Sequence, residues 1–276
     1  MTKPNHSIAA IQITSGPEVT ANLLEAERLI GEAADAGAGL VVLPENFAFM
    51  GMRERDQLAL REPDGDGQLQ SFLAETAARR GVWLVGGTIP LVASDSNHVR
   101  AASLVVDDHG ERIARYDKMH LFDVDIPGAE EHYMESSVIE PGEETLVVDS
   151  PFGRLGVAVC YDLRFPEMFR KMLDSGLELL AIPAAFTSNT GKAHWETLIR
   201  ARAIENLAYV AAAGQSGHHA NGRETHGHSM IVDPWGSVLA EIPSGVGFVF
   251  HPLDSDGQTK LRQKFPSIMH RRLKCR

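Results

Sequence analysis

The chain has 276 residues, of which 43% are hydrophobic and 7% aromatic, and its formal net charge is −11 at pH 7. This length suits one large α/β domain with an aliphatic core. The negative charge disfavours nucleic acids and anionic membranes as partners, because both bind basic surfaces. Two cysteines, Cys160 and Cys275, are too few for a disulfide framework, and we recognise neither a signal peptide nor a membrane-spanning run. We therefore expect a cytoplasmic protein.

The amino-terminal part of the chain predicts a strand, a helix and a second strand. A short apolar run indicates a strand within residues 6–14, and apolar residues at helical spacing indicate a helix over residues 18–36. Another apolar run predicts a buried strand over residues 39–44, which Glu45 follows directly. A carboxylate in this position is either a solvated strand end or, beside a thiol, a general base.

The next elements lead to a lysine. We expect a helix over residues 69–80, paired strands over residues 82–91 and 98–106, and a further strand over residues 112–116. Lys118 comes just after them. A lysine there is usually a surface charge, but its bulky apolar neighbours favour a partly enclosed ammonium.

Glu135 lies in the middle of a segment with little periodicity, residues 123–144. Two Pro-Gly turns interrupt this segment, which predicts a long functional loop or lid.

The apolar run over residues 154–159 predicts a buried parallel strand that ends on Cys160. Pro166 suits the first turn of the helix expected over residues 167–174. Cys160 therefore lies at a strand-to-helix turn, on the sheet edge where open α/β folds collect ligands. It is either a small buried hydrophobe or a nucleophile, and a nucleophilic thiol needs a base and an oxyanion stabiliser beside it.

The rest of the chain continues the alternation without a break in composition, so we expect a single domain over residues 1–276. In chain order the pattern predicts a strand, a polar loop, a helix, a strand, a hairpin, a strand, a helix and a basic tail, at residues 177–183, 186–191, 194–206, 207–213, 229–242, 247–253, 255–264 and 270–276. The tail is more typical of a solvated end or a subunit contact than of a phosphate site.

Four histidines, His218, His219, His226 and His228, lie in a glycine-containing loop. Their spacing matches no common zinc pattern and no cysteine pair completes it, so we expect local hydrogen bonding and no metal site. A metallohydrolase built on this loop stays open as an alternative.

Three motifs occur in order along the chain: residues 43–45 (LPE), 117–121 (DKMHL) and 160–167 (CYDLRFPE). Together they resemble the nitrilase, or carbon–nitrogen hydrolase, superfamily, and the resemblance extends from about residue 8 to residue 272. It implies an α/β fold in the form of a four-layer α-β-β-α sandwich, no cofactor, and a homodimer or larger homo-oligomer in which the sandwich continues across the interface. The alternation of strands and helices alone cannot distinguish two sheets from one.

The same resemblance implies the roles of the site residues. Glu45 corresponds to the general base, Cys160 to the nucleophile, and Lys118 to the group that stabilises the oxyanion together with the backbone N–H of Tyr161. Glu135 aligns with a second glutamate that positions the lysine and the substrate. The implied reaction is hydrolysis of a small amide through a thioester on the cysteine.

Several stretches, at residues 185–196, 200–206, 214–219 and 225–236, resemble the small-amidase branch, and within it the deaminated glutathione amidases. Arg164 and Thr190 match positions that contact a carboxylated substrate in that branch, and arginine can bind a carboxylate bidentately. Two departures from the family pattern are the acidic loop at residues 128–132 and the tail at residues 273–276.

Other interpretations stay open at this point. Arg164 could form a structural ion pair with Glu135, Asp162 or Glu167. An ω-amidase acting on α-ketoglutaramate or an N-carbamoyl hydrolase would keep the same triad and change the pocket. Nitrile hydrolysis is disfavoured because true nitrilases tend to be longer chains, and the complete set of three residues speaks against a catalytically silent interaction module.

Overall fold

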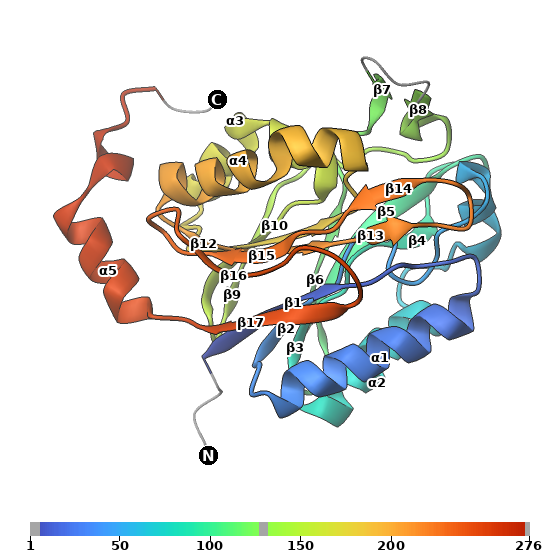
Figure 1. Ribbon diagram of the computed structural model, residues 1–276, viewed down its shortest axis with the longest axis horizontal. Helices are drawn as coiled ribbons and strands as arrows, with labels where there is room; N and C mark the ends of the chain where they lie inside the picture. The colour runs from blue at the N-terminus through green and yellow to red at the C-terminus, as the bar shows by residue number, and fades with distance from the viewer. Residues whose placement is uncertain (1–5, 127–131, 274–276) are drawn as a thin grey trace.

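The computed structural model describes residues 6–126 and 132–273, which form two facing β-sheets with helices on both outer sides (Figure 1). Helices α1 (Val19–Asp35) and α2 (Gln68–Arg80) cover one sheet. Helices α3 (Pro166–Asp174) and α4 (Ser188–Asn206) cover the other. The expected four-layer α-β-β-α sandwich is therefore confirmed, with two sheets and not one.

The sheet under α1 and α2 contains the first and last strands of the chain. Its order is β17-β1-β2-β3-β5-β4, with β6 paired to β5. β1, β2 and β3 run parallel, and β17 is antiparallel to β1. The bounds are β1 (Ser7–Gln12), β2 (Leu40–Val42), β3 (Trp83–Val85), β4 (Ile89–Val92), β5 (Val99–Val106), β6 (Arg112–Asp117) and β17 (Gly247–Pro252).

The prediction of one strand over residues 82–91 is wrong, because the chain breaks there into β3 and β4. Gly87 stands between the two strands with φ +52°, and a Cβ on it would lie 2.1 Å from the carbonyl oxygen of Pro44. Only glycine fits so close to another backbone segment in this conformation. Both short strands pair with β5.

The second sheet has the order β16-β15-β12-β11-β10-β9, and its central strands β10, β11 and β12 are parallel. Its strands are β9 (Leu146–Ser150), β10 (Gly153–Val157), β11 (Leu179–Ala184), β12 (Tyr209–Gly214), β15 (Ser229–Val232) and β16 (Val238–Ile242). The smaller elements are β7 (Asp123–Asp125), β8 (His132–Met134), β13 (Ser216–His218), β14 (Glu224–His226), α5 (Ser255–Lys264), η1 (Glu54–Leu60), η2 (Glu135–Ser137), η3 (Cys160–Arg164) and η4 (Ser267–His270).

The core occupies two layers, one between the sheets and one beneath α1 and α2. In β1, Ile8 and Ala10 belong to the layer between the sheets, whereas Ala9 and Ile11 belong to the layer under the helices. Successive side chains of a strand point to opposite faces, so a strand buried on both faces must be apolar throughout. This explains why the apolar runs locate the central strands well.

Two predicted loops contain regular structure. Residues 123–144 include the β7–β8 pair and η2, and the histidine loop contains the β13–β14 pair. Residues 128–131 of the acidic loop and residues 274–276 of the tail, with Cys275, lie outside the described residues. In the part of the chain that the structure describes, no helix is long and apolar enough to cross a membrane.

The helix predicted over residues 194–206 begins earlier, at Ser188. Thr187 is its N-cap, with its side-chain oxygen accepting from the N–H of Thr190 at 3.3 Å. Thr190 therefore lies in the first helical turn and not in a polar loop. The polar residues and Gly191 concealed these turns, because their apolar partners are few.

Candidate active site

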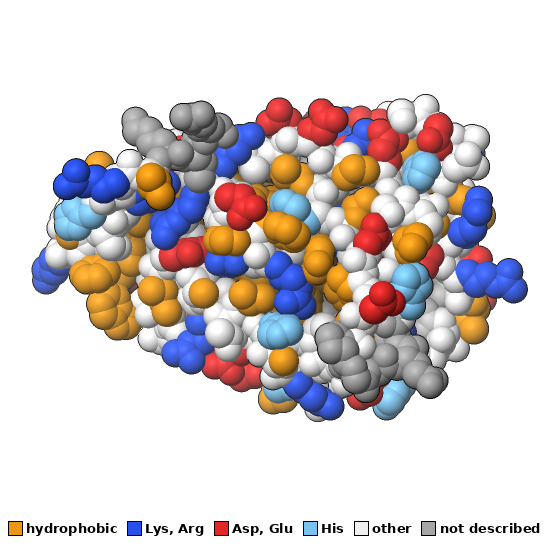
Figure 2. Space-filling view, turned by 90° about the horizontal axis from the view of Figure 1, so that it is seen from above, with side chains coloured by type: hydrophobic (Ala, Val, Ile, Leu, Met, Phe, Trp, Pro, Cys, Tyr) orange, Lys and Arg blue, Asp and Glu red, His pale blue; other side chains and the backbone are white. Residues whose placement is uncertain are grey.

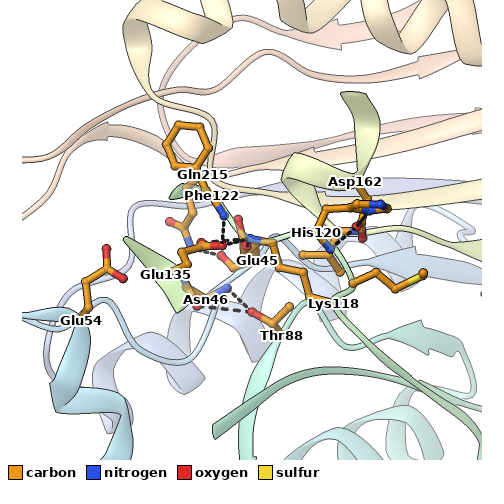
Figure 3. A network of polar contacts seen from close by, with 12 residues as sticks. Glu45, Asn46, Glu54, Thr88, Lys118, His120, Phe122, Glu135, Asp162 and Gln215 are labelled. Atoms are coloured by element: carbon orange, nitrogen blue, oxygen red, sulfur yellow. Dashed lines mark hydrogen bonds and ion pairs between the residues drawn. The ribbon is translucent and has the colours of Figure 1, made fainter. Parts of the chain in front are cut away.

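Three strand ends from both sheets meet at one place between the layers. Glu45 follows β2 and Lys118 follows β6 in one sheet, while Cys160 follows β10 in the other. Glu135 begins η2, which the chain brings back to the same place (Figure 3). The structure thus brings together the residues that the three motifs singled out, and adds Glu135 to them.

Lys118 is the centre of this arrangement. Its ammonium is fully buried and donates to Glu45 Oε1 at 2.8 Å and to Glu135 Oε1 and Oε2 at 2.9 and 2.7 Å (Figure 3). Burial opposes the charge on Lys118, but Glu135 and then Glu45 outweigh it and hold the pKa of the ammonium well above its ordinary value. Lys118 is therefore a permanent cation inside the protein.

The two carboxylates are themselves fixed by the backbone around them. Glu135 Oε2 accepts from the N–H of Phe122 at 2.8 Å. The carbonyl oxygen of Glu45 accepts from Gln215 Nε2 at 3.0 Å, and Gln215 also donates to Ser15 Oγ at 2.8 Å. The side chains around Lys118 are thus held in place before any substrate binds.

Cys160 stands at the start of η3 with φ +48°, a left-handed conformation that non-glycine residues seldom adopt. Burial, followed by the charge of Glu45, raises the pKa of the Cys160 thiol well above its ordinary value, with Lys118 acting against them. The resting group is therefore a thiol, and it needs a proton acceptor to become a nucleophile. Strained backbone of this kind is common at functional sites.

The turn that carries Cys160 is fixed by Asp162, two residues later. Asp162 is fully buried, and its Oδ2 accepts from the N–H of Val159 at 2.8 Å and from the Tyr116 hydroxyl at 2.6 Å. Its Oδ1 accepts from the N–H of His120 at 3.0 Å, and His120 Nδ1 lies 2.7 Å from the same oxygen (Figure 3). This second cluster ties the cysteine turn to the segment that carries Lys118.

A pocket opens above these groups and is lined by Cys160, Glu45, Glu135, Arg164 and Thr190, among others. Arg164 Cζ lies 5.2 Å from the ring centre of Phe186, and its Nη1 lies 3.1 Å from His194 Nδ1. The carboxylates of Glu135 and Asp162, considered as ion-pair partners of Arg164, accept from Lys118 and from Tyr116 and His120 respectively.

Tyr161 follows Cys160 in the first turn of η3. Backbone N–H groups in a first helical turn have no partner within the helix, so they can bind an anion. The Thr190 hydroxyl lies 2.9 Å from the hydroxyl of Thr187.

Sequence reasoning missed three contributors: Asp162, Gln215 and Arg223. The signal for Asp162 was an acidic residue inside the cysteine motif, which has to find donors because it is buried. Gln215 carried a similar signal, a polar residue directly after the apolar run of β12. Arg223 also lines the pocket, but nothing in its local sequence distinguishes it from a surface arginine.

The histidines interact locally. His219 has one ring nitrogen 2.8 Å from the carbonyl oxygen of Ser15 and the other 2.8 Å from Thr225 Oγ1. The His226 and His228 rings stack with their centres 4.3 Å apart. Among the residues that the structure describes, no group of three or more His, Cys, Asp or Glu is arranged to hold a metal ion.

Comparisons with known proteins bear on the same residues. Residues 7–262 match the family model described as carbon-nitrogen hydrolase. A deaminated glutathione amidase of Yersinia enterocolitica is 41% identical, over 97% of this chain and 93% of the relative.

Two solved structures are also similar. The crystal structure of Saccharomyces cerevisiae Nit3, a member of branch 10 of the nitrilase superfamily, has a TM-score of 0.86 at 30% identity and covers 97% of this chain and 96% of its own. An amidase from Nesterenkonia sp. AN1, with the acetamide moiety of fluoroacetamide covalently added at its active-site cysteine, has a TM-score of 0.79 at 27% identity, covering 99% and 95%.

Proposed function

The chain belongs to the carbon–nitrogen hydrolase family, enzymes that hydrolyse amide C–N bonds other than peptide bonds, and from this premise we propose that Cys160 is its nucleophile, Glu45 its general base and Lys118 its oxyanion-stabilising cation. The observation that carries the proposal is the buried Lys118 ammonium, hydrogen-bonded to two carboxylates and placed in one pocket with a free thiol. The covalent adduct on the cysteine of the Nesterenkonia amidase supports it.

The first half of the proposed reaction forms a thioester. The thiol proton of Cys160 passes to the Glu45 carboxylate as the sulfur attacks the amide carbon. The C=O electron pair moves to the oxygen, and the resulting oxyanion is bound by Lys118 and by the backbone N–H of Tyr161. The C–N bond then breaks as Glu45 returns the proton to the leaving nitrogen, so the amine departs neutral.

The hydrogen bonds of Lys118 suit this sequence of charges. An ammonium has three donors, and in the resting site they are directed at Glu45 and Glu135. When Glu45 takes the thiol proton it loses its charge and binds the ammonium less strongly. A donor is released at the moment when negative charge develops on the substrate oxygen, while Glu135 continues to hold Lys118.

The second half releases the acid. Glu45 removes a proton from water, which attacks the thioester carbon, and the oxyanion is bound as before. The C–S bond breaks, the sulfur takes the proton from Glu45, and the free thiol is restored. No oxidant, reductant or cofactor is required.

We propose deaminated glutathione as the substrate, because the Yersinia relative carries that activity in its name and matches almost the whole chain. This amide joins a 2-oxoglutaryl group to cysteinylglycine, so its acyl part carries a carboxylate beside a ketone. Arg164 and Thr190 line the pocket and are proposed to bind that carboxylate. A guanidinium can form two parallel hydrogen bonds with a carboxylate.

The test is hydrolysis of deaminated glutathione and α-ketoglutaramate side by side, with Cys160→Ala as the blank. We expect faster, Cys160-dependent turnover of deaminated glutathione. A preference for α-ketoglutaramate would instead identify an ω-amidase, and activity that survives in Cys160→Ala would contradict the proposed nucleophile. Failure of both substrates, with Cys160-dependent turnover of an N-carbamoyl compound, would keep the triad and reject the substrate.

We further propose that the protein is a homo-oligomer and works in a reducing compartment such as the cytoplasm. The α3–α4 side of the molecule carries hydrophobic side chains among charged ones (Figure 2), and Ile204 of α4 is 47% exposed. A free catalytic thiol is preserved best where disulfides do not persist. Light scattering should give a mass of at least twice the 30.1 kDa chain, and a monomeric mass would reject the oligomer.

A further inference from the structure

A second cavity opens beside the catalytic pocket, and we call it the outer cavity. Its volume is about 450 Å³, and it lies between η1 with the segment preceding it and the β13–β14 turn. Asn46 and Arg223 line both the outer cavity and the catalytic pocket, so the two are continuous. Cavities of this size bind small molecules, yet none of the roles proposed above uses it.

Arg223 lies at the junction of the two cavities with its side chain 15% exposed. Its Cζ lies 4.5 Å from the ring centre of Tyr133, which fixes the plane of the guanidinium. Its backbone N–H donates to Asn221 Oδ1 at 3.0 Å, and Asn221 Nδ2 donates to the carbonyl oxygen of Gly51 across the cavity at 2.8 Å. The arginine is therefore held in place before a ligand arrives.

The nearest ion pair of Arg223 is a loose one. Its Nη2 lies 3.9 Å from Glu54 Oε1, which is longer than a hydrogen bond. Burial raises the pKa of Glu54, with Arg223 opposing, so this carboxylate is a weak counter-ion. In Figure 3, Glu54 lies beyond Glu135, on the side away from His120 and Asp162. A guanidinium in this setting can bind a carboxylate more closely than Glu54 does.

Amide hydrolysis needs space on both sides of the carbonyl carbon, one for the acyl group and one for the amine that leaves. A leaving group of two residues extends up to about 7 Å from the scissile nitrogen, which takes its terminal carboxylate out of the catalytic pocket. Arg164 lines the catalytic pocket and not the outer cavity, whereas Arg223 lines both. The two arginines thus suit two different carboxylates.

We propose that the outer cavity is the leaving-group subsite and that Arg223 binds the terminal carboxylate of a short peptide-like amine. This inference rests on the proposed function and adds the residue that distinguishes a dipeptide leaving group from ammonia. Arg223 is then a specificity-determining residue: it contributes to catalysis of the larger substrate and leaves the hydrolysis of a primary amide unaffected.

The test uses three amides that share the 2-oxoglutaryl group and differ in the amine: ammonia, cysteinylglycine, and cysteinylglycine with its carboxylate converted to an amide. In the wild type, we expect the capped dipeptide substrate to lose about 10- to 100-fold in kcat/KM relative to the uncapped one, mostly through KM. Arg223→Gln should reduce kcat/KM for the uncapped substrate by a similar factor and cost nothing further on the capped one. Hydrolysis of the primary amide should change less than twofold.

Two further variants sharpen the result. Arg223→Lys should recover part of the lost activity, because it restores the charge without the bidentate geometry. Arg53→Gln is the matched control, since Arg53 lines the same cavity but is exposed, and it should change each kcat/KM less than twofold. The primary amide reports on folding, and the capped substrate on wild-type enzyme tests the subsite even if Arg223→Gln does not fold.

Each failure is distinct. Equal losses on all three substrates in Arg223→Gln would make Arg223 an acyl-site or structural residue and overturn the inference, as would equal kcat/KM of capped and uncapped substrates in the wild type. If the wild type hydrolyses none of the three in a Cys160-dependent way, the proposed substrate class is rejected and the leaving-group subsite with it. Normal wild-type turnover with a neutral Arg223→Gln rejects the subsite alone.

Discussion

Two clusters of buried polar groups flank Cys160, and they differ in how their carboxylates are satisfied. Asp162 is fully buried and accepts hydrogen bonds from backbone N–H groups and from a neutral hydroxyl, with His120 completing its shell. Glu45 and Glu135 instead share the Lys118 ammonium and face a pocket. One cluster is saturated by protein groups, while the other holds charge against charge.

The difference indicates two functions for buried carboxylates. A carboxylate whose oxygens accept several fixed donors gains nothing from a proton, so Asp162 suits a structural role. A carboxylate whose main partner is an ammonium can accept a proton if a new anion takes over that partner. The Lys118 cluster is therefore the part able to move a proton, and the Asp162 cluster the part that keeps the cysteine turn in place.

The largest expected effect separates the two clusters at Lys118. If this ammonium stabilises the oxyanion, Lys118→Ala should reduce turnover by about 10² to 10³. It should also lower the melting temperature, since it leaves two buried carboxylates without their cation. Lys171→Ala, at an exposed lysine of α3, is the control and should change neither quantity. Near-normal turnover in Lys118→Ala would contradict the role assigned to the lysine.

The next prediction concerns the proton of Cys160. Its pKa is raised by burial and then by the Glu45 charge, so removing that charge should lower it. The ultraviolet absorbance of the thiolate, measured against Cys160→Ala, should appear above the ordinary cysteine pKa of about 8.5 in the wild type. In Glu45→Gln the transition should move to lower pH, because a neutral amide no longer repels the thiolate. An unmoved or higher transition would mean that Glu45 does not act on the thiol.

A smaller effect on chemistry and a clear one on stability are expected at Asp162. Asp162→Asn keeps the shape but replaces an acceptor oxygen by an NH₂ group that faces other donors. We expect a loss of about 1–3 kcal/mol in the free energy of unfolding and of about tenfold in kcat/KM. Denaturant unfolding and steady-state kinetics measure the two. A loss of activity as large as that of Lys118→Ala at normal stability would place Asp162 among the reacting groups.

The two clusters also differ in how well the sequence predicts them. Glu45, Lys118 and Cys160 each end an apolar strand, and strand ends are local features that the pattern of apolar residues locates. Their meeting point was implied by the order of three motifs. What no local pattern shows is that Gln215, 170 residues after Glu45, holds the backbone of that glutamate.

The missed features have a common physical origin. The break at Gly87 depends on the carbonyl of Pro44, and the early start of α4 on a cap at Thr187 and on His226 packing against Gly191, where a Cβ would lie 2.2 Å from the imidazole Cγ. Asp162 is structural because Tyr116 and His120 come from another sheet. Each depends on a neighbour distant in sequence, which the periodicity of one segment does not encode.

The smallest expected effect tests the edge of the saturated cluster. The Tyr116 hydroxyl donates to Asp162 Oδ2 at 2.6 Å and accepts from the N–H of Met119 at 3.2 Å. Burial, followed by the charge of Asp162, raises the pKa of Tyr116 well above its ordinary value, so the hydroxyl remains a donor across the working pH range.

Tyr116→Phe removes this one donor and keeps the ring in the core, so we expect a loss of about 0.5–1.5 kcal/mol in the free energy of unfolding. Turnover should fall less than twofold, because Asp162 keeps its bonds from Val159 and His120 and the turn that carries Cys160 stays in place. The double variant Tyr116→Phe with Asp162→Asn should lose less stability than the sum of the two single variants, since both remove the same bond. Strict additivity would show that the two side chains do not interact, and the Asp162 cluster would then not be the single framework described above.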